Sequence, residues 1–340
     1  MRILITGGSG FVGSNIAVFL KKNNKKLNIF SLDNLSRDSS KINLQRLKEY
    51  KIKNYKLNVE EKKTYQKIGK YDLIIDCCAE AAVEKSKKNS ELVFNSNLKG
   101  TFFLLDKALK DKGKIIFLST SRVYSINKIK TKVGNINSKF KKFSISESFC
   151  TESPISLYGF TKLSSEILIK EYAYIKKIKY IINRFGVISG PWQFGKQDQG
   201  FISLWLWKHL KKQKLKYIGF EGKGNQIRDV LHIDDVCKLI HEQIKKFNKI
   251  NNITFNVGGG LKNLISLKTL SKKCEIITGN KISFSQNKKT SIYDIPYYAS
   301  NNAKIYKYYS WRIKKNIKEI LVDCFNILKK NQLFYDKIDK

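Results

Sequence analysis

A tyrosine and a lysine four residues apart, Tyr158 and Lys162 in the stretch SLYGFTK, have side chains and spacing suited to acid–base chemistry. Residues i and i+4 lie on one face of a helix, one turn apart. A phenol with a reference pKa of about 10 is a poor base at neutral pH. An ammonium group one turn away stabilises the phenolate and lowers that pKa. The pair predicts a tyrosine that takes a proton from a hydroxyl group, although the same spacing also occurs on helix surfaces without any catalytic role.

A glycine-rich turn, TGGSGFVG, follows the apolar run RILI and precedes a predicted helix over about 11–22. Gly8, Gly10 and Gly13 satisfy G-x-G-x-x-G, and Gly7 with the latter two satisfies G-x-x-G-x-x-G. Such glycines permit a tight turn and let a pyrophosphate approach the helix N-terminus, where free N–H groups and the helix dipole favour anions. The turn predicts a dinucleotide site; the alternative is a purely structural turn.

The carboxylate of Asp33 ends the next apolar run, 20 residues after Gly13. At that position a carboxylate binds the ribose hydroxyls and repels a 2′-phosphate. We therefore expect NAD rather than NADP as the cofactor. Arg37, close by, leaves NADP as an alternative.

The elements that position these residues alternate between apolar runs and helical patterns. RILITG, LNIFSLD, DLIIDCCA, KIIFLST and YIINRFG are predicted strands, and a long helix is expected over about 156–175. Continuous apolar strands separated by helices predict a parallel sheet covered on both faces. The expected fold is therefore α/β, a Rossmann-type doubly wound parallel sheet with a smaller C-terminal α/β substrate lobe. The Lys- and Ser-rich stretch from Ile126 to Ser148 is predicted to be a surface loop or hairpin.

Two functional parts are expected. Residues 1–186, with a returning segment at about 229–258, should bind the cofactor. Residues 187–228 and 259–340 should form the substrate lobe, because the pattern beyond Gly190 becomes irregular.

The chain is strongly basic, with 66 Lys and Arg against 28 Asp and Glu and a formal net charge of +38. Only seven of the basic residues are Arg, and the lysines are spread along the whole chain. This distribution favours a coding bias on solvated positions over a dedicated nucleic-acid face, although a non-catalytic nucleic-acid-binding protein of the same fold stays an alternative. The charge should still attract phosphate-bearing ligands.

The cysteines and histidines indicate neither a zinc site nor a disulfide framework. Six cysteines show no CxxC spacing, and the three histidines do not cluster. Reduced thiols in the cytoplasm are expected. The first residues look like a strand rather than a signal peptide, and no apolar run approaches the ~20 residues of a membrane span.

Together these features resemble the extended short-chain dehydrogenase/reductase family, the group of nucleotide-sugar epimerases and dehydratases, over nearly the whole chain. TGGSGFVG, DNLSR, NLKGT, LSTSRVY, YGFTK, IRDVLHIDD and FNVGGG occur in the order and spacing of that family. The resemblance implies hydride transfer from a sugar carbon to NAD while Tyr158 removes the hydroxyl proton, with Thr120 and Lys162 as its catalytic partners. The cofactor contacts it implies are Gly7, Gly10, Phe11, Val12, Gly13, Asp33, Asn34, Asn58, Val59, Asn97, Tyr158 and Lys162.

Several positions bear on which reaction the resemblance implies. Dehydratases of the family carry an acidic pair after the catalytic Thr, and here Ser121 and Arg122 stand there, which disfavours dehydration. An epimerase needs no such acid, because the ketone reorients and the hydride returns to its opposite face. Asn97 resembles the family's Asn that orders a water relay to the lysine. Asn58 stands where the family usually has an adenine-contacting Asp.

The expected substrate is a nucleotide-diphosphate sugar. Arg228 resembles a phosphate contact of the family, the alternative being a structural Arg paired with Asp229 or Asp234. A second family Arg is replaced by Ser291, near Lys288 and Lys289. The loop GPWQFGKQDQG, residues 190–200, resembles CDP-paratose 2-epimerases, which implies epimerisation at C2 of a CDP-linked dideoxy sugar. The implied substrate contacts are Arg122, Trp192, Gln197, Asp198, Gln199 and Arg228, with Phe194 as a further apolar wall.

Other outcomes stay open. The loop 190–200 is alternatively a self-capping turn with Trp192 buried in the core. The activity is alternatively that of a UDP-hexose 4-epimerase or a reductase. By analogy with the family we expect a homodimer that pairs through helices at about 92–109 and 156–175.

Overall fold

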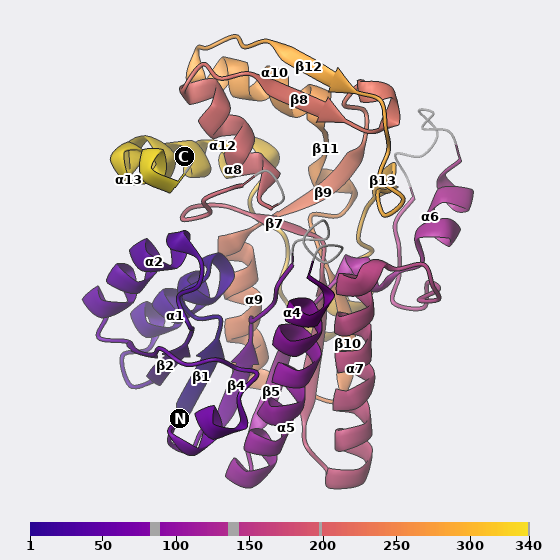
Figure 1. The fold of residues 1–340 in the computed structure, drawn as a ribbon. Coiled ribbons are helices and arrows are strands. Elements are labelled where there is room, and N and C mark those ends of the chain that lie inside the picture. The colour runs from indigo at the N-terminus through magenta and orange to yellow at the C-terminus, as the bar shows by residue number, and fades with distance from the viewer. Residues whose placement is uncertain (82–88, 135–142, 197–198, 339–340) are drawn as a thin grey trace. The chain divides into compact units, whose positions relative to one another are not determined.

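The computed structural model describes residues 1–81, 89–134, 143–196 and 199–338 of the chain (Figure 1). The chain divides into two compact units. The first unit comprises Met1–Val123, Leu157–Arg184 and Val236–Phe255, and the second comprises Tyr124–Ser156, Phe185–Asp235 and Asn256–Lys340. The division into a cofactor part and a substrate part remains a prediction about what each unit binds.

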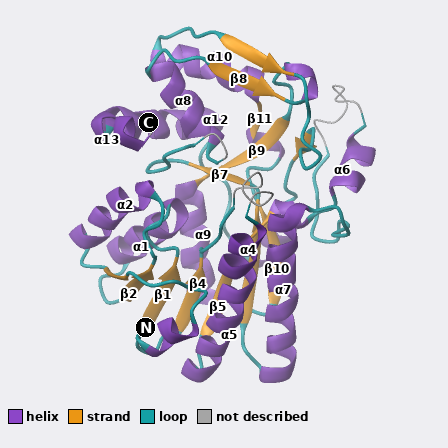
Figure 2. Cartoon of the chain, in the orientation of Figure 1, coloured by secondary structure: helices purple, strands orange, loops and turns teal. Residues whose placement is uncertain are grey.

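The first unit is built on a seven-stranded sheet with the order β10-β6-β5-β4-β1-β2-β3. Figure 2 labels β2, β1, β4, β5 and β10 of this sheet. β1 pairs in parallel with β2 and β4, β2 with β3, and β4 with β5. The chain runs outward from β1 in one direction and from β4 in the other, so the two halves wind in opposite directions. The predicted Rossmann-type parallel sheet is confirmed. Its strands are β1 Arg2–Thr6, β2 Asn28–Leu32, β3 Lys53–Tyr55, β4 Leu73–Asp76, β5 Lys114–Thr120, β6 Tyr180–Phe185 and β10 Ile253–Val257.

Helices cover both faces of this sheet. On one face α1 and α9 meet through Phe19 and His241, whose ring centroids lie 6.0 Å apart. The Arg46 side chain of α2 reaches Ser14 of α1 on the same face. On the other face α5 and α7 lie side by side (Figure 1), and the Tyr172 hydroxyl donates to Asp106 across them. The helical segments of this unit are α1 Phe11–Asn23, α2 Asp38–Glu49, η1 Lys62–Gln66, α4 Ser90–Phe94, η2 Asn95–Lys99, α5 Gly100–Asp111, η3 Ser121–Val123, α7 Ser156–Lys176 and α9 Ile233–Lys246.

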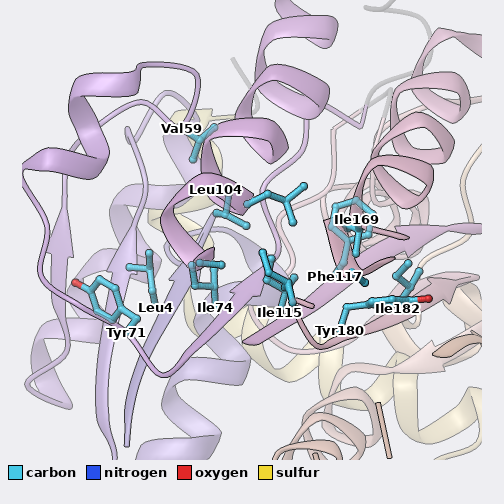
Figure 3. Packing of buried hydrophobic residues seen from close by; sticks show 14 of the residues in the cluster. Leu4, Val59, Tyr71, Ile74, Leu104, Ile115, Phe117, Ile169, Tyr180 and Ile182 are labelled. Atoms are coloured by element: carbon cyan, nitrogen blue, oxygen red, sulfur yellow. The ribbon is translucent and has the colours of Figure 1, made fainter. Parts of the chain in front are cut away.

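The core beneath α5 and α7 explains why the apolar runs form a central sheet. Figure 3 shows Leu104 of α5 and Ile169 of α7 packed over side chains from β4, β5 and β6, including Ile74, Ile115 and Phe117. All five are essentially inaccessible to solvent. Strands buried on both faces lack the polar alternation of a half-exposed sheet, which is why they appear as continuous apolar runs.

The second unit carries a four-stranded sheet, in which β9 pairs with β7, β11 and β13, and a two-stranded sheet of β8 and β12. Its strands are β7 Val187–Ser189, β8 Leu215–Ile218, β9 Ile227–His232, β11 Leu264–Ser266, β12 Phe284–Asn287 and β13 Tyr297–Tyr298. Its helical segments are α6 Ile126–Val133, α8 Phe201–Leu210, η5 Phe220–Gly222, η6 Leu261–Asn263, α10 Leu267–Thr278, α11 Ala303–Tyr308, α12 Ile317–Lys330 and α13 Gln332–Ile338.

One element prediction is wrong. The stretch from Ile126 was expected to be a loop or hairpin, and its first part is the helix α6. Ile126, Ile129 and Val133 recur at helical spacing and are buried, so an apolar stripe was present beneath the lysines that suggested a loop. Among the described helices, none is long and apolar enough to cross a membrane.

Candidate active site

The glycine turn after β1 is shaped by the absence of side chains. Gly7 adopts φ +60°, a conformation that favours glycine. A Cβ added to Gly13 would lie 2.3 Å from the Gly7 carbonyl oxygen, so the helix can approach the turn only without one. Gly10 is the N-cap of α1, and no side chain of the described residues caps this helix. The N–H groups of its first turn, those of Phe11, Val12 and Gly13, therefore keep the donors and the positive dipole end that an anion needs.

Asp33 lies beside this turn, directly after β2. Its carboxylate accepts hydrogen bonds from the backbone N–H groups of Ser9 at 3.1 Å and Leu35 at 2.8 Å. Burial raises the pKa of Asp33, while these hydrogen bonds and the charge of Arg37 act in the opposite direction. The structure thus holds the predicted ribose-binding carboxylate against the glycine turn.

The remaining predicted adenine-side residues form a chain of amides. The Asn34 Nδ2 donates to the Asn58 Oδ1 at 2.8 Å, and the Asn58 Nδ2 donates to Glu61 at 2.9 Å. The Asn58 oxygen that was expected to meet adenine thus already accepts one hydrogen bond, and it has one further lone pair to offer. Val59 is buried, and its methyl group would lie 3.0 Å from a Cβ on Gly100 of α5.

Thr120 and Tyr158 come together at the carboxyl end of β5. Thr120 is the last residue of β5, and its Oγ1 accepts from the backbone N–H of Arg122 at 3.2 Å. Burial raises the pKa of Tyr158 above its usual value, and hydrogen bonding with Thr120 and the charges of Arg122 and Arg37 only partly offset this rise. The structure therefore adds two guanidinium groups to the environment of Tyr158, which the Tyr-x-x-x-Lys spacing did not reveal.

Lys162 is nearly inaccessible, at 2% exposure, and its Nζ lies 3.8 Å from the centroid of the Phe117 ring. Burial lowers the pKa of Lys162, and the largest effect in the opposite direction is the charge of Asp76, with a smaller one from Glu166. An ammonium in this environment depends on the carboxylates that surround it to stay charged.

Asn97 lies in the π-helical segment η2, between α4 and α5. Its Oδ1 accepts from the Glu80 N–H at 2.8 Å, and its Nδ2 donates to the Glu80 carbonyl at 3.3 Å and to Thr161 of α7 at 3.0 Å. The predicted Asn therefore ties the segment after β4 to the residue that precedes Lys162. Short π-helical segments within helices frequently occur at functional sites.

Sequence reasoning missed two carboxylates, Asp76 and Glu80, near these residues. Glu80 forms an ion pair with Arg37, with 3.0 Å between Oε1 and Nη2, and its charge raises the pKa of Tyr158. Both carboxylates stand at or just after the end of β4, the strand beside which the winding of the sheet reverses. Ligand sites of doubly wound sheets lie outside the carboxyl ends of such strands, which is the signal that could have found them.

In the second unit, Arg228 of β9 forms an ion pair with Asp294, with 2.8 Å between Nη2 and Oδ1. The partners considered from the sequence are engaged elsewhere: Asp229 accepts from the N–H groups of Gly260 and Ser300, and Asp234 lies 3.7 Å from His232. The Arg228 side chain is thus largely buried, and the carboxylate of Asp294 orients its guanidinium.

The loop 190–200 is described except for Gln197 and Asp198, which lie outside the described residues. The ring of Phe194 lies 5.7 and 5.5 Å from those of Phe334 and Tyr335, so it packs within the core of this unit. Trp192 is only partly buried, and Gln199 is exposed and pairs with Lys196 in an isolated β-bridge.

Elsewhere in this unit, Lys288 and Lys289 are exposed, whereas Ser291 is partly buried and its carbonyl accepts the N–H of Asp294. All six cysteines have free thiols. Within the described ranges, no group of three or more His, Cys, Asp and Glu side chains is placed to hold a metal ion.

Comparison with known proteins places this geometry in a family. A model of the NAD dependent epimerase/dehydratase family matches residues 3–258. CDP-paratose 2-epimerase of Salmonella typhi is 30% identical over 291 residues, covering 81% of this chain and 84% of that protein. dTDP-D-glucose 4,6-dehydratase of Dictyostelium discoideum is 33% identical over 266 residues, covering 76% of this chain and 58% of that protein.

Among solved structures, UDP-glucose 4-epimerase of Thermotoga maritima with UDP-glucose superposes with a TM-score of 0.81 at 24% identity, covering 98% of this chain and 100% of that one. At that identity the likeness shows the fold. The family match spans most of the chain, and the family's NAD dependence confirms the predicted cofactor. The relatives include an epimerase and a dehydratase, so they support an enzyme without selecting one reaction. The chain belongs to the NAD dependent epimerase/dehydratase family.

Proposed function

We propose that this protein is an NAD-dependent nucleotide-sugar epimerase that inverts C2 of CDP-paratose. One observation carries the choice of epimerase over dehydratase. Beside the Thr120–Tyr158 pair, the residues that follow Thr120 are Ser121 and Arg122, and the Arg122 charge acts on Tyr158. A guanidinium there stabilises a phenolate and cannot donate a proton to expel water. The similarity to CDP-paratose 2-epimerase supports the choice of sugar.

The residues present fit NAD. Because Gly13 has no side chain, α1 packs closely against the turn at Gly7. The N-terminus of α1 has no side-chain cap, so its N–H groups can donate to the pyrophosphate. Asp33 would accept the hydroxyls of the adenosine ribose, and its negative charge would exclude a 2′-phosphate. Bound NAD would supply the hydride acceptor and donor for the sugar carbon.

The chain's own residues handle the proton. Tyr158, as the phenolate, takes the proton from the sugar hydroxyl while the carbon is oxidised to the ketone, and returns it when the carbon is reduced. Thr120 hydrogen-bonds with the Tyr158 side chain and orients it, and Arg122 and Arg37 favour the phenolate. Between the two steps the ketone presents its opposite face, and the hydride removed from the carbon returns to that face. The reaction is therefore redox-neutral and needs no added cofactor.

The second unit would supply the substrate contacts. Arg228, which is held by Asp294, offers the planar donor array that suits a diphosphate. Trp192 and Gln199, together with Gln197 and Asp198, are proposed to border the sugar. The burial of Phe194 against Phe334 removes that ring from the proposed pocket walls.

We also propose a homodimer that forms through the outer surfaces of α5 and α7. Both helices expose large apolar side chains, which in a stable protein mark an interaction surface. The exposed side chains are Phe102, Leu109, Phe160, Ile167 and Tyr174. A cytoplasmic location is supported by the six free thiols.

The reaction is tested by incubating purified protein with CDP-, UDP-, GDP- and dTDP-linked sugars and following each ring proton by NMR. We expect inversion at C2 of CDP-paratose without added NAD. In D₂O the C2 position should gain no deuterium, because the same hydride returns. Tyr158→Phe is the matched control and should be inactive. Inversion at C4 of a UDP-hexose instead would establish the alternative, and the proposal fails if the protein carries no NAD and converts none of the sugars.

A further inference from the structure

A row of three side chains crosses adjacent strands on the face of the sheet beneath α5 and α7. Thr6 of β1 is in register with Asp76 of β4, and Asp76 is in register with Phe117 of β5. Register partners on neighbouring strands present their side chains to the same face of a sheet. The Thr6 Oγ1 donates to the Asp76 Oδ1 at 2.5 Å, and Phe117 lies in the core under α7 (Figure 3).

The ammonium of Lys162 reaches this row from α7. Its Nζ lies 3.8 Å from the centre of the Phe117 ring, so it sits over the residue that neighbours Asp76. Lys162 and Asp76 are 2% and 4% exposed. A buried carboxylate close to a buried ammonium stabilises the charged form of that ammonium.

The other carboxylate near Lys162 already has a cation. Glu166, one turn further along α7, accepts from Arg184 Nη2 at 2.7 Å and from Arg184 Nε at 3.0 and 3.1 Å, and also from Ser119. Asp76 accepts from two neutral donors, the hydroxyl of Thr6 and the backbone N–H of Cys78. Of the two carboxylates, Asp76 is therefore the one whose charge is left for Lys162.

We propose that Asp76 is the buried counter-ion of Lys162 and keeps its ammonium charged and in place beside the Tyr158 site. Asp76 is a positioning residue, because it acts through Lys162 and touches no reacting atom. Its consequence for catalysis rests on the proposed function, whereas the counter-ion role itself does not.

The groups that surround the Lys162 ammonium differ from those that surround the Tyr158 hydroxyl. Those around the Lys162 ammonium are Asp76, Cys77, Cys78 and Glu166, and those around the Tyr158 hydroxyl are Thr120, Arg122, Arg37 and Glu80. Asp76 is the largest of the influences that raise the pKa of Lys162 against the effect of burial. The effect of a substitution at Asp76 should therefore be measured first on the pKa of Lys162.

The test is an NMR titration of the full chain with NAD bound and lysines labelled with ¹³C at Cε. The Lys162 signal is identified by its loss in Lys162→Gln. In Asp76→Asn, which still accepts from Thr6, we expect the pKa of Lys162 to fall by about one pH unit or more, as when an opposite charge within about 4–6 Å is removed. Glu171→Gln is the control, because it removes an exposed carboxylate from the same helix about 14 Å further along.

An unchanged titration of Lys162 in a folded Asp76→Asn variant overturns the proposal, as does an equal fall in Glu171→Gln. If Asp76→Asn fails to fold, Asp76→Asn combined with Lys162→Gln gives a second readout: a counter-ion role requires the double variant to regain folding, because no buried ammonium is left unpaired. The titration needs no sugar turnover, so a chain that shows the shift and converts no nucleotide sugar keeps the counter-ion role of Asp76 and loses only the proposed reaction.

Discussion

The buried ion pair between Arg184 and Glu166 should be among the most sensitive points of the first unit. Glu166 is fully inaccessible and Arg184 is 5% exposed, and Glu166 joins three elements by also accepting from Ser119. Ser119 lies on β5 directly before Thr120, Glu166 lies on α7 one turn after Lys162, and Arg184 lies on β6. Glu166 therefore joins β5 and α7, the two elements that carry the proposed catalytic residues, and Arg184 of β6 holds its carboxylate in place.

Arg184→Met removes three hydrogen bonds, at 2.7, 3.0 and 3.1 Å, and leaves a carboxylate buried. Breaking such a pair from one side costs about 3–5 kcal/mol of unfolding free energy, because the remaining charge is uncompensated. In the double variant Glu166→Leu/Arg184→Met no charge stays behind, and most of that loss should be regained. As a surface control, Asp38→Asn breaks an exposed pair with Lys41 at 3.5 Å and should change the free energy by less than about 1 kcal/mol.

The choice of probe follows from the location of the tryptophans. Trp192, Trp205, Trp207 and Trp311 all belong to the second unit. Tryptophan fluorescence in urea therefore reports that unit, and hydrogen exchange of β5 and β6 amides followed by mass spectrometry reports the first. If Arg184→Met lowers the unfolding free energy of β5 and β6 by less than about 1 kcal/mol, the reasoning is refuted. It is also refuted if the double variant loses as much stability as Glu166→Leu and Arg184→Met do separately when their losses are added.

Three further outcomes concern the proposed site. Tyr158→Phe should reduce epimerisation at least about 10²-fold, the usual contribution of a general base, while absorbance at 260 nm shows that NAD is still bound. Arg122→Gln should shift the rising limb of the kcat/KM–pH profile to higher pH, because the phenolate is the active form and a charge that lowers the pKa of Tyr158 has been removed. Gly13→Ala should weaken NAD binding in a fluorescence titration, since its Cβ would lie 2.3 Å from the Gly7 carbonyl oxygen. An unshifted pH profile, or wild-type affinity in Gly13→Ala, would count against these assignments.

The strands and the glycine turn were predictable because their causes are local. A strand buried on both faces must be apolar throughout, and a turn with φ +60° at Gly7 favours glycine. The sequence of Ile126–Val133 was misjudged because its lysines suggested solvent exposure while every third or fourth residue was buried. Composition alone does not distinguish a charged loop from an amphipathic helix, whereas the spacing of the apolar residues does.

The environment of Tyr158 was only half predictable, because its members come from separate strands and loops. The Tyr-x-x-x-Lys spacing identifies one neighbour at one helical turn. Arg37, Glu80 and Arg122 follow three different strands, and only the sheet order brings their charges to bear on one phenol. The partner of Arg228 was missed for the same reason, since Asp294 is 66 residues distant along the chain.

The distribution of arginine in a lysine-rich chain gives these contacts further weight. Only seven arginines occur among 66 basic residues. Each has a specific contact: Arg184 and Arg228 pair with carboxylates, and Arg46 reaches Ser14 and Asn43 while nearly buried. Arg2 and Arg312 lie over aromatic rings and donate to backbone carbonyls.

Arg37 and Arg122, the remaining two, act on Tyr158. A guanidinium stays charged when buried and presents five N–H donors in a fixed plane, whereas a lysine ammonium has three donors and loses its proton more readily when buried. The net charge of +38 therefore has two physically different parts. Lysine supplies nearly all of the positive charge, and the few arginines occupy positions where the direction of their hydrogen bonds matters. On this argument, replacing Arg37 or Arg122 with Lys should impair the Tyr158 site even though the charge of the chain is unchanged.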